Sequence, residues 1–437
     1  MAMSFLIAIL TATMVVPANS AQIPTETPAA SPRLEAIDRV WSGHYSRFAL
    51  VTTQRQILVA YYDANRQLSV ATRSRTDGAS WVYHRLDSWT GWDSHNFIAA
   101  AIDAAGHIHI VANLHNDPLV YYRSDRPGDP RTLVRRATMV DAARERRMTY
   151  PVFLTDALGG LVFKYRDGGS GNGNELYNRY DAVTGRWTAL LTSPLADGEG
   201  RRNAYFVGPT PGPDGRFHLA WVWRETPDAA TNHDLSYAVS RDLIHWTRAD
   251  GSPLALPITL NRAEIVDPVP ERGGMINNNT VIGFDRLGRP IITYHKFIAD
   301  GSTQIFLARF EGSRWRIAQA SDWRGFRWDF GGGGSLDSRL FVEGAVPGDP
   351  DQLRIRVRRD DKPLDLIVDE AMLTRIAERP ASALADRLAP MIQTPPGMIL
   401  HTVEGDGAAI AWPTRPPRRD MASPDIPEPT TLRLILP

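Results

Sequence analysis

Two histidines, a tyrosine and an arginine lie at matching places around turns of the D-x-x-G type. His95 precedes the turn Asp103–Gly106, and His115 follows it at nearly the same distance. Tyr150 and Arg166 flank the next such turn in the same way. If each turn joins two antiparallel strands, the start of the first strand and the end of the second lie on one edge, about 5 Å apart. We therefore expect these four side chains to gather on one face of the molecule.

Further polar residues occupy similar places around later turns. Taken alone, each has an ordinary interpretation, such as a turn histidine, a strand aromatic or an arginine paired with a neighbouring aspartate. Their recurrence on one edge favours a binding site instead. For His233, which follows a long loop, two roles stay open: facing the substrate or holding a structural ion. The predicted substrate-binding residues are Asn203, Tyr205, Arg224, His233, Asn278 and His295.

This set of side chains suits proton abstraction next to a carboxylate. Arg166 can neutralise a uronate carboxylate through paired, charge-assisted hydrogen bonds. A base must then remove the C-5 proton, and an acid must protonate the leaving oxygen on C-4. The pKa of histidine is ~6.5 and that of tyrosine ~10, so His95, His115 and Tyr150 can share these tasks in either order. A nearby cation favours phenolate, so we expect the pKa of Tyr150 to lie below ~10.

A repeated unit positions these residues. It consists of a short strand, a D-x-x-G-like turn, a second apolar strand, a strand containing tyrosine, and a turn ending in tryptophan. One copy reads HNFIAAAIDAAGHIHIVANLH followed by LVYYRSD. Repeats of about 40–50 residues built in this way are typical of propeller blades. The turn glycines that mark the copies are Gly106, Gly159, Gly215 and Gly288.

Five such copies are readable, and residues 334–365 and 398–437 can supply two more. The sequence thus predicts an all-β fold, a β-propeller of seven blades, each a four-stranded antiparallel sheet. The C-terminal LRLILP is expected to close the ring. Active sites of propellers lie at the funnel mouth where the inner strands meet. A pair of β-sandwiches is the alternative fold.

The ends of the chain and one internal segment differ from the repeats. Residues 1–21 contain an apolar run followed by small residues, which predicts a secretory signal peptide and a periplasmic or secreted protein. Residues 22–36 are rich in Pro, Thr, Ala and Ser and are interpreted as a disordered leader. Residues 37–437 are expected to form a single propeller domain, with a helical insertion near 366–392.

Composition excludes several classes of function. Lys+Arg and Asp+Glu both number 49, which argues against a nucleic-acid binder. The absence of cysteine excludes disulfides, thiolate catalysis, cysteine-based zinc sites and a lipid anchor on cysteine. The apolar N-terminal run is too short for a membrane span. We expect a monomer with no membrane anchor that needs no cofactor or metal for catalysis, while a structural Ca or Zn ion stays open.

Several short segments resemble the BNR-type repeat family. They are WDSHN, NLH, RMTYPVF, FKYRDG and NAYF, together with the blade end SRDLIHW. Within that family they are most similar to the propeller polysaccharide lyases, namely the ulvan lyases and the L-rhamnose-α-1,4-D-glucuronate lyases. The resemblance covers roughly residues 40–330.

The resemblance implies both an activity and roles for individual residues. In those enzymes a His pair, a Tyr and an Arg form the site, which points here to His95, His115, Tyr150 and Arg166 as catalytic residues. Tyr205 matches a further tyrosine that lines a sugar subsite. The implied function is a polysaccharide lyase that cleaves rhamnosyl-α-1,4-glucuronate linkages by β-elimination and leaves an unsaturated uronate. The implied partner is a glucuronate-containing polysaccharide or oligosaccharide.

Two other functions stay open at this point. SRTDGASW and SRDLIHW are similar to the Asp boxes of sialidase-like glycoside hydrolases. Such enzymes need an arginine triad, which cannot be assembled here at equivalent blade positions. The second alternative is a non-catalytic carbohydrate-binding propeller, in which the histidines and arginines only hold a sugar acid.

Overall fold

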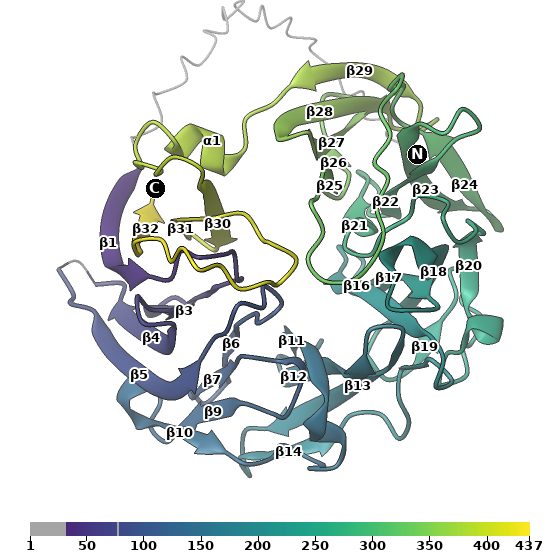
Figure 1. Cartoon of the computed structure of the whole chain (residues 1–437). Helices are drawn as coiled ribbons and strands as arrows, with labels where there is room; N and C mark the ends of the chain where they lie inside the picture. The colour runs from purple at the N-terminus through teal and green to yellow at the C-terminus, as the bar shows by residue number, and fades with distance from the viewer. Residues whose placement is uncertain (1–31, 77) are drawn as a thin grey trace, which may run out of the picture.

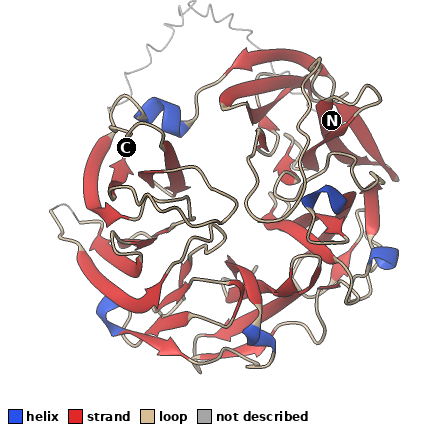
Figure 2. Cartoon of the chain, viewed as in Figure 1, coloured by secondary structure: helices blue, strands red, loops and turns tan. Residues whose placement is uncertain are grey.

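Seven antiparallel sheets surround a central axis in the computed structural model, which describes residues 32–76 and 78–437 (Figure 1). Strands dominate the described chain, and helices are few and short (Figure 2). The β-propeller predicted from the repeats is confirmed, and so is the count of seven blades. The predicted signal peptide, residues 1–21, lies outside the described residues. No helix of the described chain combines the length and apolar character that a membrane span requires.

The first three blades follow the chain in order. The first contains β2 (Ala49–Thr52), β3 (Gln56–Tyr62), β4 (Gln67–Ser74) and β5 (Val82–Trp89). The second contains β6 (Ala99–Ile102), β7 (Ile108–Val111), β9 (Tyr121–Ser124) and β10 (Leu133–Arg136). The third contains β11 (Met148–Thr155), β12 (Leu161–Gly169), β13 (Asn172–Asp181) and β14 (Arg186–Ala189), with β15 (Ala196–Asp197) beside β13. β8 (His115–Asp117) comes from the connection after β7 but pairs with β11, so it ties the second blade to the third.

The next three blades have the same meander. The fourth contains β16 (Asn203–Pro211), β17 (Phe217–Arg224), β18 (Asn232–Ser240) and β19 (Trp246–Thr247), with β20 (Glu264–Asp267) beside β18. The fifth contains β21 (Val281–Phe284), β22 (Pro290–Phe297), β23 (Thr303–Glu311) and β24 (Arg314–Gln319). The sixth contains β25 (Leu340–Val342), β27 (Gln352–Arg359), β28 (Lys362–Asp369) and β29 (Arg375–Pro380), with β26 (Val346–Pro347) beside β27.

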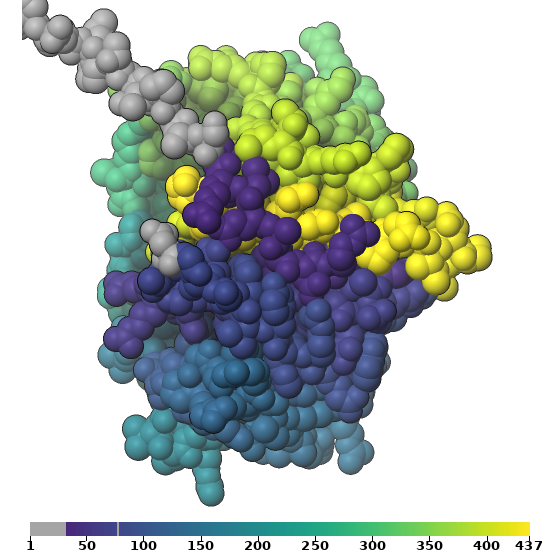
Figure 3. Space-filling model, turned by 90° about the vertical axis from the view of Figure 1, so that its left-hand side faces the viewer, coloured from purple at the N-terminus to yellow at the C-terminus, as the bar shows by residue number. Residues whose placement is uncertain are grey.

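The two ends of the chain close the ring in the seventh blade. It contains β30 (Ile399–Gly405), β31 (Ala408–Thr414) and β32 (Thr430–Leu436), and β1 (Arg33–Val40) completes it as the outermost strand. Arg33 pairs with Leu436 at one end of this contact and Val40 with Thr430 at the other. The space-filling view shows the purple N-terminal strand against yellow C-terminal segments (Figure 3). Because β1 begins at Arg33, the predicted disordered leader 22–36 is wrong over its last four residues.

The predicted helical insertion near 366–392 is also wrong over most of its length. β28 and β29 occupy residues up to Pro380, and the only α-helix of the described residues is α1 (Leu384–Leu388). Leu366, Ile367 and Val368 are all buried, and periodicity alone cannot distinguish such a short apolar run in a strand from a buried helix. The remaining helical turns are short 3-10 segments at Pro130–Thr132, Arg144–Arg146, Ala229–Thr231 and Leu260–Arg262.

Apolar layers between neighbouring blades form the core. Each blade presents its two faces to two neighbours, so its central strands are apolar on both sides rather than on one. One cluster joins the third and fourth blades through Val162, Leu219 and Trp221, and another joins the fourth and fifth through Val222, Leu235 and Ile292. These layers leave the ends of the inner hairpins around the axis to polar side chains.

Candidate active site

The inner hairpin of the third blade carries a β-bulge at Tyr150. β11 and β12 pair regularly until Thr149, which lies opposite Arg166, and the register shifts between Thr149 and Val152. Tyr150 lies inside this shift with a φ of 55°, in the left-handed region that a bulky residue rarely adopts. Such strain persists only where the surrounding structure enforces it, and it is common at functional sites. The bulge turns the Tyr150 side chain to the same end of the hairpin as Arg166.

Arg166 is buried with one nitrogen left free. Its side chain is only 2% exposed. Nε donates to the Gly168 carbonyl oxygen (3.0 Å), and Nη1 donates to the Tyr205 hydroxyl oxygen (3.3 Å). The guanidinium carbon lies 4.9 Å from the Tyr150 ring centre. Nη2 is buried without a hydrogen-bond partner. A buried unpaired donor is costly, and a ligand carboxylate would satisfy it.

A glycine makes room for this arginine. A Cβ atom on Gly173 would lie 2.8 Å from both Cγ and Cδ of Arg166 and 2.7 Å from Oδ1 of Asn203. Those distances are shorter than van der Waals contact allows, so no larger residue fits without moving the guanidinium. Asn203 is itself buried, and its Nδ2 has no partner. Asn203 and Arg166 thus present two unsatisfied donors from adjacent blades.

Tyr205 lies between two arginines. Its hydroxyl oxygen accepts from Nη1 of Arg166 and from Nη1 of Arg224, both at 3.3 Å, and lies 2.7 Å from Oγ of Ser170. The guanidinium carbon of Arg224 is 4.2 Å from the Tyr205 ring centre. Burial raises the pKa of Tyr205, but Arg224 and Arg166 outweigh that effect, and the net pKa is lowered. This phenol is the one that the cations favour as phenolate.

The two histidines stack on each other and share one carboxylate. The ring centres of His95 and His115 are 4.2 Å apart, with an angle of 23° between the planes. Asp93 accepts from Nδ1 of both rings, at 3.0 Å from His95. His115 is placed by β8, where it lies opposite Thr149 of β11. The pair therefore belongs to the same surface as the third-blade hairpin.

The carboxylates around His95 control its charge. Burial favours the neutral ring, but hydrogen bonds and charge from Asp420 and Asp93 raise the pKa of His95 to about 9. Burial raises the pKa of Asp93, yet the two histidines reverse this and lower it below its usual range. His95 is therefore an imidazolium at neutral pH. The His115 ring pairs with Asp93 and stacks on His95, and its side chain is 25% exposed.

Tyr150 stands between the histidine pair and the arginine pair. Its ring centre lies 6.3 Å from that of His95 and 6.1 Å from that of Tyr205. The predicted lowering of its pKa is wrong. Burial and the neighbouring Tyr205 raise the pKa of Tyr150 to about 12, although Arg166 and Arg224 act in the opposite direction. The phenol of Tyr150 is thus kept protonated.

The structure brings seven of the ten predicted residues together and places three elsewhere. His95, His115, Tyr150, Arg166, Asn203, Tyr205 and Arg224 form one continuous cluster. His233 faces a different group, with Nε2 3.0 Å from Glu225 and Nδ1 3.0 Å from Asp234. In β18 its neighbour Asn232, not His233, accepts from Arg224. Alternation along the strand explains why His233 points away from the cluster.

Asn278 and His295 lie outside the cluster for different reasons. Asn278 is exposed, while the preceding Asn277 accepts from Nη2 of Arg224. His295 is 1% exposed and stacks on Trp328 with ring centres 5.4 Å apart, and Nδ2 of Asn279 lies 3.1 Å from its Nε2. Burial lowers the pKa of His295 to about 4. It is a neutral core histidine beneath a covering loop.

Sequence reasoning missed several residues that contact the cluster. Asp93 was within reach, because it precedes His95 by two residues in WDSHN and such a spacing suits a carboxylate that orients a histidine. Ser170, Asn277 and Asp420 had no comparable signal, since each lies in a connection whose course depends on the assembled ring.

One cluster among the described residues has the composition of a metal site. The nearest ligand atoms of Asp93, His95 and His115 all lie within 4.8 Å of one another. Both Nδ1 atoms are already engaged with the carboxylate of Asp93, so we interpret the cluster as a hydrogen-bonded triad and assign no metal ligands.

Comparison with known proteins identifies the family. The model of the BNR repeat-containing family matches residues 56–323, more than half of the chain. The chain belongs to this family. No curated protein matches it.

Solved structures share the architecture of this BNR repeat protein at low sequence identity. The polysaccharide lyase Uly1 is similar with a TM-score of 0.60 and 16% identity, and the match covers 90% of each chain. An ulvan lyase of a new polysaccharide lyase family, bound to -[GlcA(1-4)Rha3S]-, is similar with a TM-score of 0.59 and 13% identity. That match covers 92% of this chain and 95% of the other. The structural similarity to these propellers thus covers nearly the whole chain.

Proposed function

We propose that the protein is a polysaccharide lyase that cleaves on the nonreducing side of a glucuronate residue by β-elimination. The observation that carries the proposal is the unpartnered Nη2 of Arg166, buried beside Tyr150 and the histidine pair. A donor in that position suits a carboxylate on the sugar, and the acid and base candidates lie within one sugar ring of it. The likeness to ulvan lyase structures supports the same class of reaction.

The states of the side chains suggest how the proton moves. Arg166 neutralises the uronate carboxylate, which acidifies the C-5 proton. His115, oriented by Asp93, takes that proton, and the C–H electron pair becomes the C-4=C-5 double bond. The C-4–O bond breaks with its electrons on oxygen, and the protonated phenol of Tyr150 gives its proton to that oxygen. The proton on His115 then returns to Tyr150. The cationic ring of His95 stabilises the negative charge that develops.

The proposed linkage is rhamnosyl-α-1,4-glucuronate. The motif resemblance supports this linkage, and the ulvan lyase bound to -[GlcA(1-4)Rha3S]- supports a substrate built from glucuronate and rhamnose. Tyr205, Ser170 and Arg224 line the far side of Arg166 and offer hydroxyl and guanidinium groups for the neighbouring sugar. The C-4 oxygen of glucuronate and its C-5 proton are on the same ring face, which allows one cluster to serve both.

The test is the ultraviolet absorbance of the unsaturated uronate. The protein is incubated with ulvan, gum arabic and other glucuronate polymers, with the Arg166→Ala variant as the matched control. We expect absorbance to rise with polymers that contain the rhamnosyl-glucuronate linkage and to stay flat with the variant. Sugar release without absorbance would point to a hydrolase, and binding without release would point to a lectin-like propeller.

We also propose that the protein is exported, to the periplasm or beyond. The support is the apolar run between Phe5 and Val16, followed by small residues up to Ala21. Protein recovered outside the cytoplasm of its native host should begin near residues 20–24. N-terminal sequencing that returned an intact Met1 from that fraction would contradict export.

A further inference from the structure

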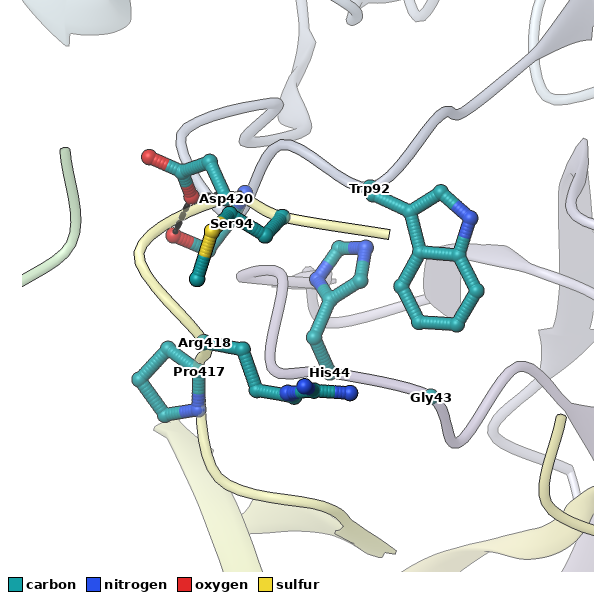
Figure 4. A pocket seen from close by; sticks show the side chains of 8 residues that line it. Gly43, His44, Trp92, Ser94, Pro417, Arg418 and Asp420 are labelled. Atoms are coloured by element: carbon teal, nitrogen blue, oxygen red, sulfur yellow. Dashed lines mark hydrogen bonds between the residues drawn. The ribbon is translucent and has the colours of Figure 1, made fainter. Parts of the chain in front are cut away.

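Three segments distant in sequence meet at the carboxylate of Asp420. The connection between β31 and β32 brings Asp420 to the connection between β5 and β6, where Figure 4 shows it against Ser94. Oδ1 of Asp420 accepts from the backbone N of Ser94 (3.0 Å) and from its Oγ (2.8 Å). Oδ1 and Oδ2 also accept from Oγ (2.6 Å) and N (3.0 Å) of Ser335. A single side chain of the seventh blade thus joins the connection between the first and second blades to the connection between the fifth and sixth.

The backbone at this point is strained. Arg419 and Asp420 have φ values of 51° and 63°, so two successive residues with side chains adopt the left-handed conformation. Neither is a glycine, and a residue with a side chain keeps this conformation only where the surrounding structure enforces it. The hydrogen bonds of the carboxylate are the interactions that hold this conformation. The strained backbone therefore indicates that the surrounding structure holds Asp420 in one position.

The segment that Asp420 holds is a strap of four glycines, Gly331–Gly334, followed by Ser335. Its other end is fixed by Asp228, whose Oδ1 accepts from the backbone N of Gly332 (2.6 Å). The Gly332 carbonyl oxygen accepts from the backbone N of Ala229 (2.9 Å). Glycines have little conformational preference of their own. The strap therefore takes its course from the two carboxylates, one beside Arg224 of the fourth blade and one beside His95.

Asp420 also reaches the histidine pair. Its Oδ2 lies 3.4 Å from Nδ1 of His95, the atom that Asp93 contacts from the other side at 3.0 Å. The other groups that face the His95 ring are His115, stacked at 4.2 Å, and Tyr150, at 6.3 Å. Burial raises the pKa of Asp420, but His95, Ser335 and Ser94 outweigh it and keep the pKa well below its usual range. The Asp420 carboxylate is thus ionised in the folded protein at neutral pH.

We propose that Asp420 is a positioning residue of the active site, which fixes the ring of His95 and anchors the glycine strap over the funnel mouth. This inference rests on the proposed lyase function for its effect on turnover, although its structural part stands alone. Asp420 has no role in the proton transfers. It acts through His95, by holding the ring against His115 and Tyr150 and by keeping the ring cationic.

The test compares Asp420→Asn with two matched controls. Asn keeps the shape and an accepting oxygen but removes the charge. Ser335→Ala removes one hydrogen bond of the clamp without changing charge, and Asp425→Asn removes an exposed carboxylate of the same connection that pairs with Arg415. Histidine NMR in buffer with a chelator follows the His95 ring through a pH titration, with His95→Gln used to identify its signal. Hydrogen exchange follows the backbone amides of residues 331–335.

We expect Asp420→Asn to lower the pKa of His95 by about 1–3 units, since one of two opposite charges is lost, and to speed exchange across the strap. The alkaline limb of the pH–kcat profile should move to lower pH by the same amount. Ser335→Ala should speed exchange alone, and Asp425→Asn should change neither. An unchanged His95 titration in Asp420→Asn would overturn the proposal. If wild-type protein released no unsaturated product, the lyase function would fail while the NMR and exchange results still decided the positioning role.

Discussion

The inner hairpins of the third and fifth blades begin from the same sequence pattern and end differently. Each flanks a D-x-x-G turn with polar residues, Tyr150 and Arg166 in one and Asn278 and His295 in the other. In the third blade the register breaks at Tyr150, and the side chain enters the funnel. In the fifth blade β21 and β22 pair without a shift, and His295 is covered by Trp328.

The comparison shows that a place at the funnel end of a hairpin does not by itself make a site. Two further conditions decide the outcome. The backbone must break its alternation, as the bulge does at Tyr150, and the buried side chain must face polar partners of the cluster. The connection after β24 places Trp328 against His295, whereas Arg166, which is equally buried, donates to the Tyr205 hydroxyl and keeps Nη2 for a ligand. The predictions below separate these two hairpins by activity and by stability.

Tyr150→Phe should have the largest effect. The substitution keeps the ring and its packing but removes the proton donor, and general acid contributions are typically ~10²–10⁴-fold. We expect kcat to fall by at least about a hundredfold while the midpoint of thermal unfolding stays within a few degrees. Steady-state kinetics on a rhamnosyl-glucuronate polymer measures the first quantity, and calorimetry measures the second. A variant with most of its activity would leave the histidines as both acid and base.

Arg166→Ala should follow closely. Loss of an electrostatic partner that acts on the developing charge costs about 2.7–4 kcal/mol in turnover, or ~10²–10³-fold. Arg166→Lys should restore little, because a lysine cannot offer two parallel N–H donors to a carboxylate. Near-normal kcat/KM in Arg166→Ala, with an unchanged unfolding midpoint, would show that another group neutralises the uronate.

The dependence of kcat on pH should show an alkaline limb that is set by the pKa of His95. Its pKa is raised to about 9 in the folded protein, against ~6.5 for a free histidine. The ring is cationic below that value, so turnover should decline as pH rises through about 9. The same shift stabilises the fold: this contribution is fully present below pH ~6.5 and is lost as pH rises through about 9. An alkaline limb that is identical in the His95→Gln variant would contradict the assignment.

His295→Gln should have the smallest effect on turnover, within about threefold, because the ring lies outside the cluster. It should instead change how stability depends on pH. Burial lowers the pKa of His295 to about 4, so the unfolded chain binds its proton first as pH falls. Wild-type stability should therefore fall between pH ~6.5 and about 4, and the variant should fall less over that interval. Thermal unfolding at pH 7 and pH 5 provides the measurement.

Most of the fold could be predicted from the repeats. The site was harder to predict, because the direction of each side chain depends on which face of its strand the residue occupies. Strand length and turn spacing are local properties, so five blades could be read from the sequence, and residues 334–365 and 398–437 were expected to supply two more. The side-chain direction of His233 depends on a single-residue register, and a shift by one residue separated Asn278 from Asn277. The pKa of Tyr150 moved opposite to expectation because burial, which is a property of the assembled ring, outweighed the nearby Arg166. Asp420 and the glycine strap depend on contacts between blades, which no local pattern encodes.

Isotopic oxygen provides the most direct measurement of the central claim, that this cluster eliminates rather than hydrolyses. The protein is incubated with a rhamnosyl-glucuronate oligosaccharide in water enriched in heavy oxygen, and the products are weighed by mass spectrometry. Elimination breaks the C-4–O bond without water, so we predict two products whose masses sum to the substrate, with no heavy oxygen taken up. Arg166→Ala should give neither product. Products heavier in sum by one water that carries the heavy isotope would contradict the account and assign the site to a glycoside hydrolase.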